Sequence, residues 1–262
     1  MTDSSSRNLQ GEMRSVETIS ADERASMHAI FAAHFSQTTS RQFENDLAEK
    51  DACIILRDGN TAKIQGFSTL QKLRVDIGGQ PAIAIFSGDT IVNREHWGAT
   101  ELIKIWAQHV FGLGQSSGST EVYWFLITSG YRTYRFLPVF FREFFPTYHQ
   151  ATPPSTKRLI DQLGELKFPG EYSPETGVIR LSRPTPLLSG ISEVTPARLT
   201  DPHIQYFVRA NPGHADGDEL ACLTRIDYAN LTRAGRRLFP AQLSPSLGTA
   251  PLTTSGLQNP TQ

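Results

Sequence analysis

The sequence predicts an α/β fold in which a mixed central sheet is flanked by helices and followed by a C-terminal extension. Three features predict it: short apolar runs separated by turn residues, one strongly amphipathic helix at 100–113, and a buried strand directly after it at 121–127. A helix between two strands of one sheet is a crossover connection, which makes the flanking strands parallel. The earlier strands are joined by tight turns and are therefore expected to be antiparallel.

Two helices are expected before the first strand. Ser20 is placed to cap the first of them, and Glu23 lies three residues later, as a capping box requires. The second helix spans about 40–49, where Phe43 and Leu47 are four residues apart and share a face. Both helices therefore have an apolar side to pack on the sheet.

Three strands are expected next, at 52–57, about 63–75 and 80–92. The turn signals Asp58-Gly59 and Gly78-Gly79 lie between them, and such pairs are typical of tight hairpins. We therefore predict an antiparallel meander of three strands.

The helix at 100–113 has the clearest apolar stripe in the sequence. The stripe consists of Leu102, Trp106, Val110 and Leu113. The run at 121–127 is apolar almost throughout, as expected of a buried central strand. A Phe-rich segment at 136–145 follows, and Pro138 within it is expected to kink a helix or to start one.

Composition divides the chain into four parts. Residues 1–18 are polar and are expected to form a flexible N-terminus, whereas residues 19–150 carry the strand and helix patterns of the main domain. Residues 151–239 are expected to be a C-terminal accessory region. Residues 240–262 are rich in Pro, Ser, Thr and Gly and are expected to be a disordered tail.

Composition also excludes several classes of protein. With 39% hydrophobic residues and a net charge of -1, the chain can build a sizeable core and shows no basic excess for nucleic acid or an anionic membrane. Cys53 and Cys222 lie far apart and indicate no disulfide framework. The polar start does not resemble a signal peptide, and no apolar run approaches the roughly 20 residues of a membrane span. We expect a cytoplasmic protein.

The junction between the third strand and the strong helix is the most informative segment. Gly98 lies just before the helix, where the lack of a side chain lets backbone approach a ligand closely. The first turn of a helix offers unpaired N–H groups and the positive end of its dipole. The junction therefore predicts a pyrophosphate site, with a tight turn needed only for packing as the alternative.

The order of the elements resembles that of the GNAT superfamily of acyl-CoA N-acyltransferases, over about residues 20–146. In that family a Gln/Arg-x-x-Gly-x-Gly/Ala turn holds the pyrophosphate of CoA with its backbone amides. The matching segment here runs from Glu95 to Thr100, in which Gly98 matches and the first and last positions depart. The resemblance implies an acyl-CoA or acetyl-CoA donor, with these residues at its site: Val92, Arg94, Gly98, Ala99 and Thr100. Acyl carrier protein is the alternative carrier.

The resemblance also implies a tyrosine that protonates the leaving thiolate. Tyr134 is the first candidate and Tyr131 the second, and the alternative is that both rings are packing residues. A general base takes a proton from the attacking amine, and Asp89, just before the glycine turn, is the candidate. Its alternative role is to cap a bulge or turn.

The expected reaction is direct acyl transfer to a small-molecule amine, with a hydroxyl as the less favoured acceptor. A catalytically inactive binding or scaffolding module is the rival hypothesis. The polar cluster at 211–219 lacks a recognised metal-ligand spacing, so no metal is predicted and His214 is left as a candidate for the acceptor pocket. Six aromatic residues are expected to be mostly core, with a fraction lining an acyl channel: Trp97, Trp106, Phe140, Phe141, Phe144 and Phe145.

Overall fold

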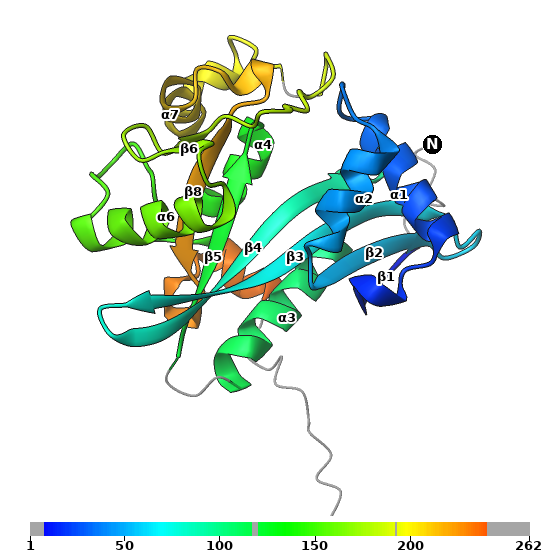
Figure 1. The fold of residues 1–262 in the computed structure, drawn as a ribbon, viewed down its shortest axis with the longest axis horizontal. Coiled ribbons are helices and arrows are strands. Elements are labelled where there is room, and N and C mark those ends of the chain that lie inside the picture. The colour runs from blue at the N-terminus through cyan, green and yellow to red at the C-terminus, as the bar shows by residue number, and fades with distance from the viewer. Residues whose placement is uncertain (1–7, 117–119, 192, 240–262) are drawn as a thin grey trace, which may run out of the picture.

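The computed structural model describes residues 8–116, 120–191 and 193–239, and it contains one eight-stranded sheet (Figure 1). Its strand order is β1-β2-β3-β4-β5-β8-β7-β6. The strands are β1 (Leu9–Ser15), β2 (Ala52–Asp58), β3 (Ile64–Ile77), β4 (Gln80–Val92), β5 (Glu121–Thr128), β6 (Tyr172–Ser173), β7 (Val178–Ile179) and β8 (Glu219–Arg225).

The sheet is mixed, as predicted. Its one parallel pair in the described part of the chain is β4 with β5, and the connection between them is α3 (Glu101–Ser116). The pairs β2–β3 and β3–β4 form the predicted antiparallel meander. This combination confirms the crossover that the strand, helix and strand order predicted.

Helices cover both faces of the sheet (Figure 1). One face carries α1 (Ala21–Ala32), α2 (Ser40–Ala48) and α6 (Pro154–Lys167), and the other carries α3, α4 (Tyr131–Tyr134), α5 (Phe136–Phe140), α7 (Pro202–Ala210) and α8 (Arg233–Leu238). Short 3-10 turns are η1 (Val16–Thr18), η2 (Arg94–His96), η3 (Arg198–Thr200), η4 (His214–Asp216) and η5 (Tyr228–Asn230). None of the helices in the described ranges is long and apolar enough to cross a membrane.

Buried side chains alternate in direction along each strand, so that successive residues pack on opposite faces of the sheet. On β5, Trp124 packs with the cluster under α3, whereas Phe125 packs with the cluster under α6. The same alternation on β8 sends Cys222 to the first cluster and Leu223 to the second. Since both faces are buried, these central strands read as continuous apolar runs in the sequence.

The C-terminal region belongs to the same sheet as the main domain. β8 pairs antiparallel with β5 from Tyr123↔Arg225 to Thr128↔Leu220, and β7 and β6 extend the sheet beyond it. Residues 151–239 therefore complete the sheet beside β5, where an accessory region had been expected. The tail predicted at 240–262 lies outside the described residues.

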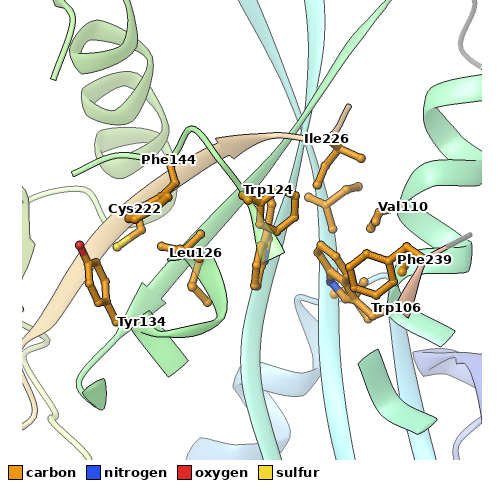
Figure 2. Packing of buried hydrophobic residues seen from close by; sticks show 14 of the residues in the cluster. Trp106, Val110, Trp124, Leu126, Tyr134, Phe144, Cys222, Ile226 and Phe239 are labelled. Carbon is orange, nitrogen blue, oxygen red and sulfur yellow. The ribbon is translucent and has the colours of Figure 1, made fainter. Parts of the chain in front are cut away.

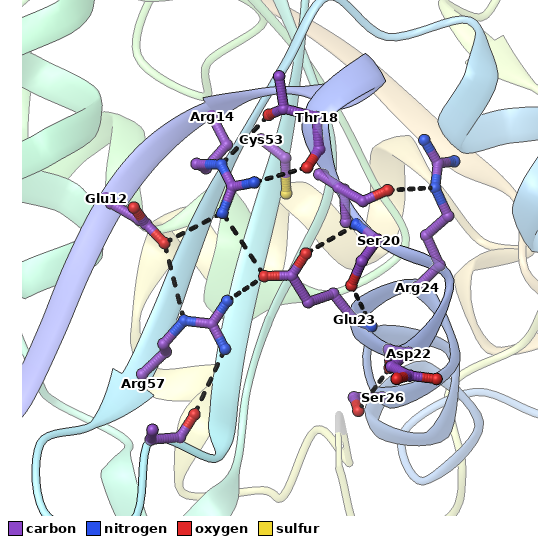
Figure 3. Close-up of polar contacts among 12 residues, drawn as sticks. Glu12, Arg14, Thr18, Ser20, Asp22, Glu23, Arg24, Ser26, Cys53 and Arg57 are labelled. Carbon is purple, nitrogen blue, oxygen red and sulfur yellow. Dashed lines mark hydrogen bonds and ion pairs between the residues drawn. The ribbon is translucent and has the colours of Figure 1, made fainter.

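The N-terminus differs from the flexible segment expected at 1–18. Residues 1–7 lie outside the described part, but Leu9–Ser15 forms the edge strand β1 along β2. Ion pairs hold this strand and α1 together (Figure 3): Glu23 contacts both Arg14 and Arg57. The strand was missed because Leu9 is its only buried residue, so its sequence shows no apolar alternation, and it is held by backbone pairing with β2 along its whole length.

The predicted capping box at the start of α1 is present. The N–H of Ser20 donates to Glu23 Oε2 at 2.7 Å, and the N–H of Glu23 donates to Ser20 Oγ at 3.3 Å (Figure 3). Glu23 thus serves two purposes, because the same carboxylate satisfies the helix end and anchors the arginines of β1 and β2.

Candidate active site

The two parallel strands part at one end. The β4–β5 ladder runs from Ala82↔Glu121 to Ser87↔Leu126 and stops there. Beyond it, β4 continues along β3 as far as Val92, and β5 continues along β8 as far as Thr128. A cavity of about 950 Å³ opens at this divergence, at the upper end of the range for small-molecule sites.

A β-bulge shapes the β4 side of the cavity. Leu70 pairs with Ser87 and Ser68 with Thr90, so that Gly88 and Asp89 together face the single residue Thr69. A side chain at position 88 would meet Thr69 Oγ1 at 2.7 Å and Lys50 Cε at 2.9 Å, which explains the glycine. The extra residue reverses the alternation of β4, and it brings the Asp89 side chain to the face that carries α2.

Asp89 lies where the sequence predicted a general base, and its surroundings suit that role. Its side chain lines the cavity but is otherwise enclosed by protein, and this burial, together with the Asp46 carboxyl, raises its pKa to about 7. The ammonium of Lys50 opposes that shift, and its Nζ lies 2.6 Å from Asp46 Oδ1. A carboxyl with a pKa near neutrality is matched to proton transfer at physiological pH.

A third acidic residue, Glu219 at the start of β8, lines the same cavity. Burial raises its pKa to about 8, the charge of Asp89 adds to the shift, and a hydrogen bond from the backbone of Ser129 opposes it. Sequence analysis treated Glu219 only as part of a polar cluster, and it did not single out Asp46 or Lys50. The spacing of Asp46 and Lys50 on one helix was visible, but their approach to Asp89 depends on the tertiary fold.

The first turn of α3 and the glycine before it form the opposite wall. Gly98 has a φ of +94°, a left-handed conformation that favours glycine, and no atom lies within 4 Å of where a Cβ would stand. Ala99, Thr100 and Val92, three further residues predicted to bind the donor, also line the cavity. The helix is long enough for its N-terminal N–H groups and dipole to attract an anion here.

Arg94 is exposed in η2 and lines a smaller cavity of about 290 Å³ with Glu95 and His34, and it does not line the main one. Two guanidinium groups lie over the ring of Trp97 beside the Gly98 turn: that of Arg132, which lines the main cavity, 4.6 Å from the ring centroid, and that of Arg94, 5.7 Å from it. Glu95 is likewise turned away, so its negative charge does not enter the proposed phosphate site.

The two candidate tyrosines have different environments. Tyr131, the first residue of α4, lines the cavity and is almost fully buried. Tyr134 is completely buried and does not line it; its hydroxyl donates to the carbonyl of Pro146 at 2.9 Å, and its ring lies beside Cys222 and Phe144 (Figure 2). Burial raises the pKa of Tyr134. Of the two tyrosines, Tyr131 is therefore the one that borders the cavity.

The aromatic residues are divided as follows. Trp97 and Phe140 line the cavity, whereas Trp106, Phe141, Phe144 and Phe145 are core residues. Trp106 and Trp124 lie side by side in the core (Figure 2). Their indole N–H groups both donate to Ser87 Oγ, at 3.2 and 2.9 Å, at the last position where β4 pairs with β5.

The polar segment at 211–219 contributes Glu219 alone to the cavity. His214 does not line it and packs on Phe207 instead, with a ring separation of 5.4 Å. Within the described ranges, no group of three or more acidic, histidine or cysteine side chains is arranged to hold a metal ion.

Comparisons with known proteins give a partial likeness of fold. No family model and no curated protein matches the sequence. Among solved structures, a probable N-acyltransferase from Enterococcus faecalis V583 matches with 14% identity and a TM-score of 0.39, over 49% of this chain and 31% of that one. A GNAT family N-acetyltransferase from Escherichia coli, solved in complex with CoA, matches with 12% identity and a TM-score of 0.34, over 47% and 65%.

A third solved structure, glucosamine-6-phosphate N-acetyltransferase from Arabidopsis thaliana, matches with 11% identity and a TM-score of 0.33, over 45% of this chain and 82% of that one. The matches span less than two thirds of the first two structures. Each of the three is similar to part of this chain at low identity.

Proposed function

We propose that this chain is a GNAT-type acyltransferase that moves an acyl group from a CoA thioester to an amine. The observation that carries the proposal is the cavity at the parting of β4 and β5, which has a helix N-terminus on one wall and Asp89 on the other. These features support an anion site and a general base beside the gap between the two strands.

The chemical groups of an acyl-CoA donor suit the gap between the diverging ends of β4 and β5. Past Ser87 and Leu126, the facing edges of β4 and β5 no longer bond to each other, so their backbone groups are available to the amides of a pantetheine arm. The pyrophosphate then lies over Gly98 and the first turn of α3, where N–H groups and the helix dipole stabilise it. Arg132 adds a positive charge on the same wall.

The transfer needs one base and one acid. The Asp89 carboxylate takes a proton from the amine as the nitrogen attacks the thioester carbon, and the C–S bond breaks when the tetrahedral intermediate collapses. The Tyr131 hydroxyl gives its proton to the leaving thiolate. The products are an amide and free CoA, and no covalent enzyme intermediate forms.

Binding of the donor is the first test, and it separates an enzyme from an inactive module. Thermal unfolding is followed with CoA, acetyl-CoA and a long-chain acyl-CoA, because a ligand of the native state raises the melting temperature by mass action. Thiol release with a panel of amines follows. A raised melting temperature with thiol release supports an acyltransferase, and stabilisation without thiol release indicates a binding module. If no CoA ester stabilises the protein, the proposed donor is wrong, and an acylated carrier protein is tested in the same assay.

A further inference from the structure

Three carboxyl groups reach one end of the cavity from three different elements. Asp46 comes from α2, Asp89 from the bulge of β4, and Glu219 from the start of β8, and all three line the cavity. They act on one another electrostatically, since Asp46 raises the pKa of Asp89, and Asp89 raises that of Glu219. We call these three residues the acidic trio.

One ammonium group of the protein, that of Lys50, already forms an ion pair with a member of this trio. Lys50 is buried, and its Nζ donates to Asp46 Oδ1 at 2.6 Å and to the Asp46 carbonyl at 2.9 Å. Because the only ion pair of the trio in the described part of the chain is this one, Asp89 and Glu219 have no cationic side chain in salt-bridge contact. Two carboxyls therefore stay available to a ligand.

An unpartnered polar atom points to the same kind of ligand. The Nδ1 of His34 lies 2.9 Å from the carbonyl of Ile30, which only accepts, so Nδ1 carries the proton and Nε2 of the neutral ring is an acceptor. His34 is 6% exposed, lines the cavity, and its Nε2 finds no partner among the described residues.

The remaining charged groups at this end do not neutralise the two free carboxyls. Glu49 pairs with Lys167, and Glu171 accepts the backbone N–H of Ser182 at 2.7 Å. Arg132, Arg135, Arg183 and Arg198 also line the cavity, but within the described residues none of them forms an ion pair with Asp89 or Glu219, and Arg135 is paired with Asp201. The two carboxyls without a cationic partner therefore favour a cationic ligand.

We propose that the acyl acceptor is a small aliphatic diamine or polyamine, held at the acidic trio by more than one ammonium group. The proposal rests on the acyltransferase function above. One amine loses its proton to Asp89 and attacks the thioester, while a second ammonium stays charged and donates to Glu219. His34 accepts from the same ligand.

The cavity also limits the acceptor to a small molecule on this side. The chain at 182–191 crosses the end of α1, where the Ser36 N–H donates to the Pro186 carbonyl at 2.8 Å and the Leu188 N–H donates to the His34 carbonyl at 2.8 Å. Thr185, Leu187 and Arg183 of this crossing segment line the cavity. A short, flexible chain with charged ends fits beside this wall of the cavity.

The first experiment measures binding alone. Calorimetry at pH 7 compares 1,4-diaminobutane and 1,5-diaminopentane with 1-aminobutane, in two buffers of different ionisation enthalpy. We expect the diamines to bind at least tenfold more tightly than the monoamine. We also expect proton release on binding, because a cation favours the ionised forms of Asp89 and Glu219. Equal affinity for diamine and monoamine, or no binding of either, would overturn the proposal.

The second experiment uses matched variants. Glu219→Gln is expected to lower the ratio of diamine affinity to monoamine affinity at least tenfold, which removes the preference for diamines. Acetyl-CoA should still raise the melting temperature of this variant as it does in the wild type. Asp216→Asn removes one charge three residues earlier, outside the cavity, and is expected to leave the preference unchanged. An unchanged preference in Glu219→Gln would refute the proposal.

An assay of thiol release then distinguishes the proposed acyltransferase function from the proposed diamine acceptor. Stabilisation by acetyl-CoA with transfer to monoamines and diamines at equal rates leaves the acyltransferase standing and overturns the diamine as its acceptor. Diamine binding in a protein that no acyl donor stabilises overturns the acyltransferase, and with it the acceptor role of the diamine.

Discussion

The carboxyl of Asp46 on α2 lies within hydrogen-bonding reach of the carboxyl of Asp89 in the bulge of β4. Two carboxylates this close do not both ionise easily, so their contact, together with burial, holds the pKa of Asp89 near 7. Lys50 limits the effect because its ammonium is bonded to Asp46. The pair thus raises the pKa of Asp89 to about 7, within the range that suits a general base at neutral pH.

Replacing Asp89 by Asn should remove the proposed base. We expect turnover to fall by about 10²–10⁴-fold, the usual loss for general base catalysis. The affinity for acetyl-CoA should change little, because the donor contacts lie on the α3 wall. In the wild type, kcat/KM should rise with pH through about 7 as Asp89 ionises, and the variant should lose this limb. A pH profile of kcat/KM for both proteins checks this.

Asp46→Asn is the companion variant, and it has a distinct signature. Removing the Asp46 charge deletes a repulsion and frees the Lys50 ammonium to act on Asp89. Both changes lower the pKa of Asp89, so the rising limb of the profile should move to lower pH while turnover at high pH is retained. If the rising limb of the kcat/KM profile does not move, a group other than Asp89 gives rise to it.

The two tyrosines can be separated by removing one hydroxyl at a time. Tyr131→Phe should lower turnover by about 10²-fold or more if its hydroxyl protonates the thiolate. Tyr134→Phe should leave turnover nearly unchanged and lower the free energy of unfolding by about 1–3 kcal/mol, because the Pro146 carbonyl loses its donor. Steady-state kinetics and urea unfolding measure the two effects. Full turnover in Tyr131→Phe would exclude it as the acid.

The stability of the protein should depend on pH through its buried carboxyls. The folded-state pKa values of Asp89 and Glu219 are raised to about 7 and 8, from unfolded values of 3.8 and 4.5. The folded state therefore binds more protons across this window, and the free energy of unfolding should decrease as pH rises from about 4 to 8. The double variant Asp89→Asn, Glu219→Gln should flatten that decrease. Melting temperatures at pH 5 and pH 8 provide the measurement.

The fold could be predicted where the sequence pattern of a helix or strand lies within one short segment of the chain. The stripe that contains Trp106 and Val110 and the apolar run of β5 give the crossover, and its parallel strands follow from connection geometry alone. β1 could not be predicted in this way, because it forms by backbone pairing with β2, a segment about 40 residues later in the chain. Its own seven residues show one buried side chain.

The site could be predicted only in part, for a related reason. Gly98 and Asp89 were found because each lies beside a strong element, and both line the cavity. Asp46 and Glu219 come from positions far apart in the chain, and only the sheet order brings them together. The choice between Tyr131 and Tyr134 depends on how the four-residue α4 packs against α7, which no periodicity reveals.

The phosphate wall can be tested at Gly98 with two side chains of the same shape. Gly98 has a φ of +94° and open space at the Cβ position, so Asn and Asp both fit sterically and both bear the strain of a left-handed backbone, about 1–2 kcal/mol. Asn and Asp tolerate that conformation better than other residues do, and their comparison cancels the strain. Only Asp places a negative charge where the pyrophosphate is expected to meet the first turn of α3.

We therefore expect Gly98→Asp to weaken acetyl-CoA binding at least tenfold more than Gly98→Asn, with similar melting temperatures for the two unliganded variants. Calorimetric titration at low and high salt is the measurement, and the difference should shrink at high salt because ions screen exposed charges. Equal affinities in the two variants at low salt would place the pyrophosphate away from Gly98.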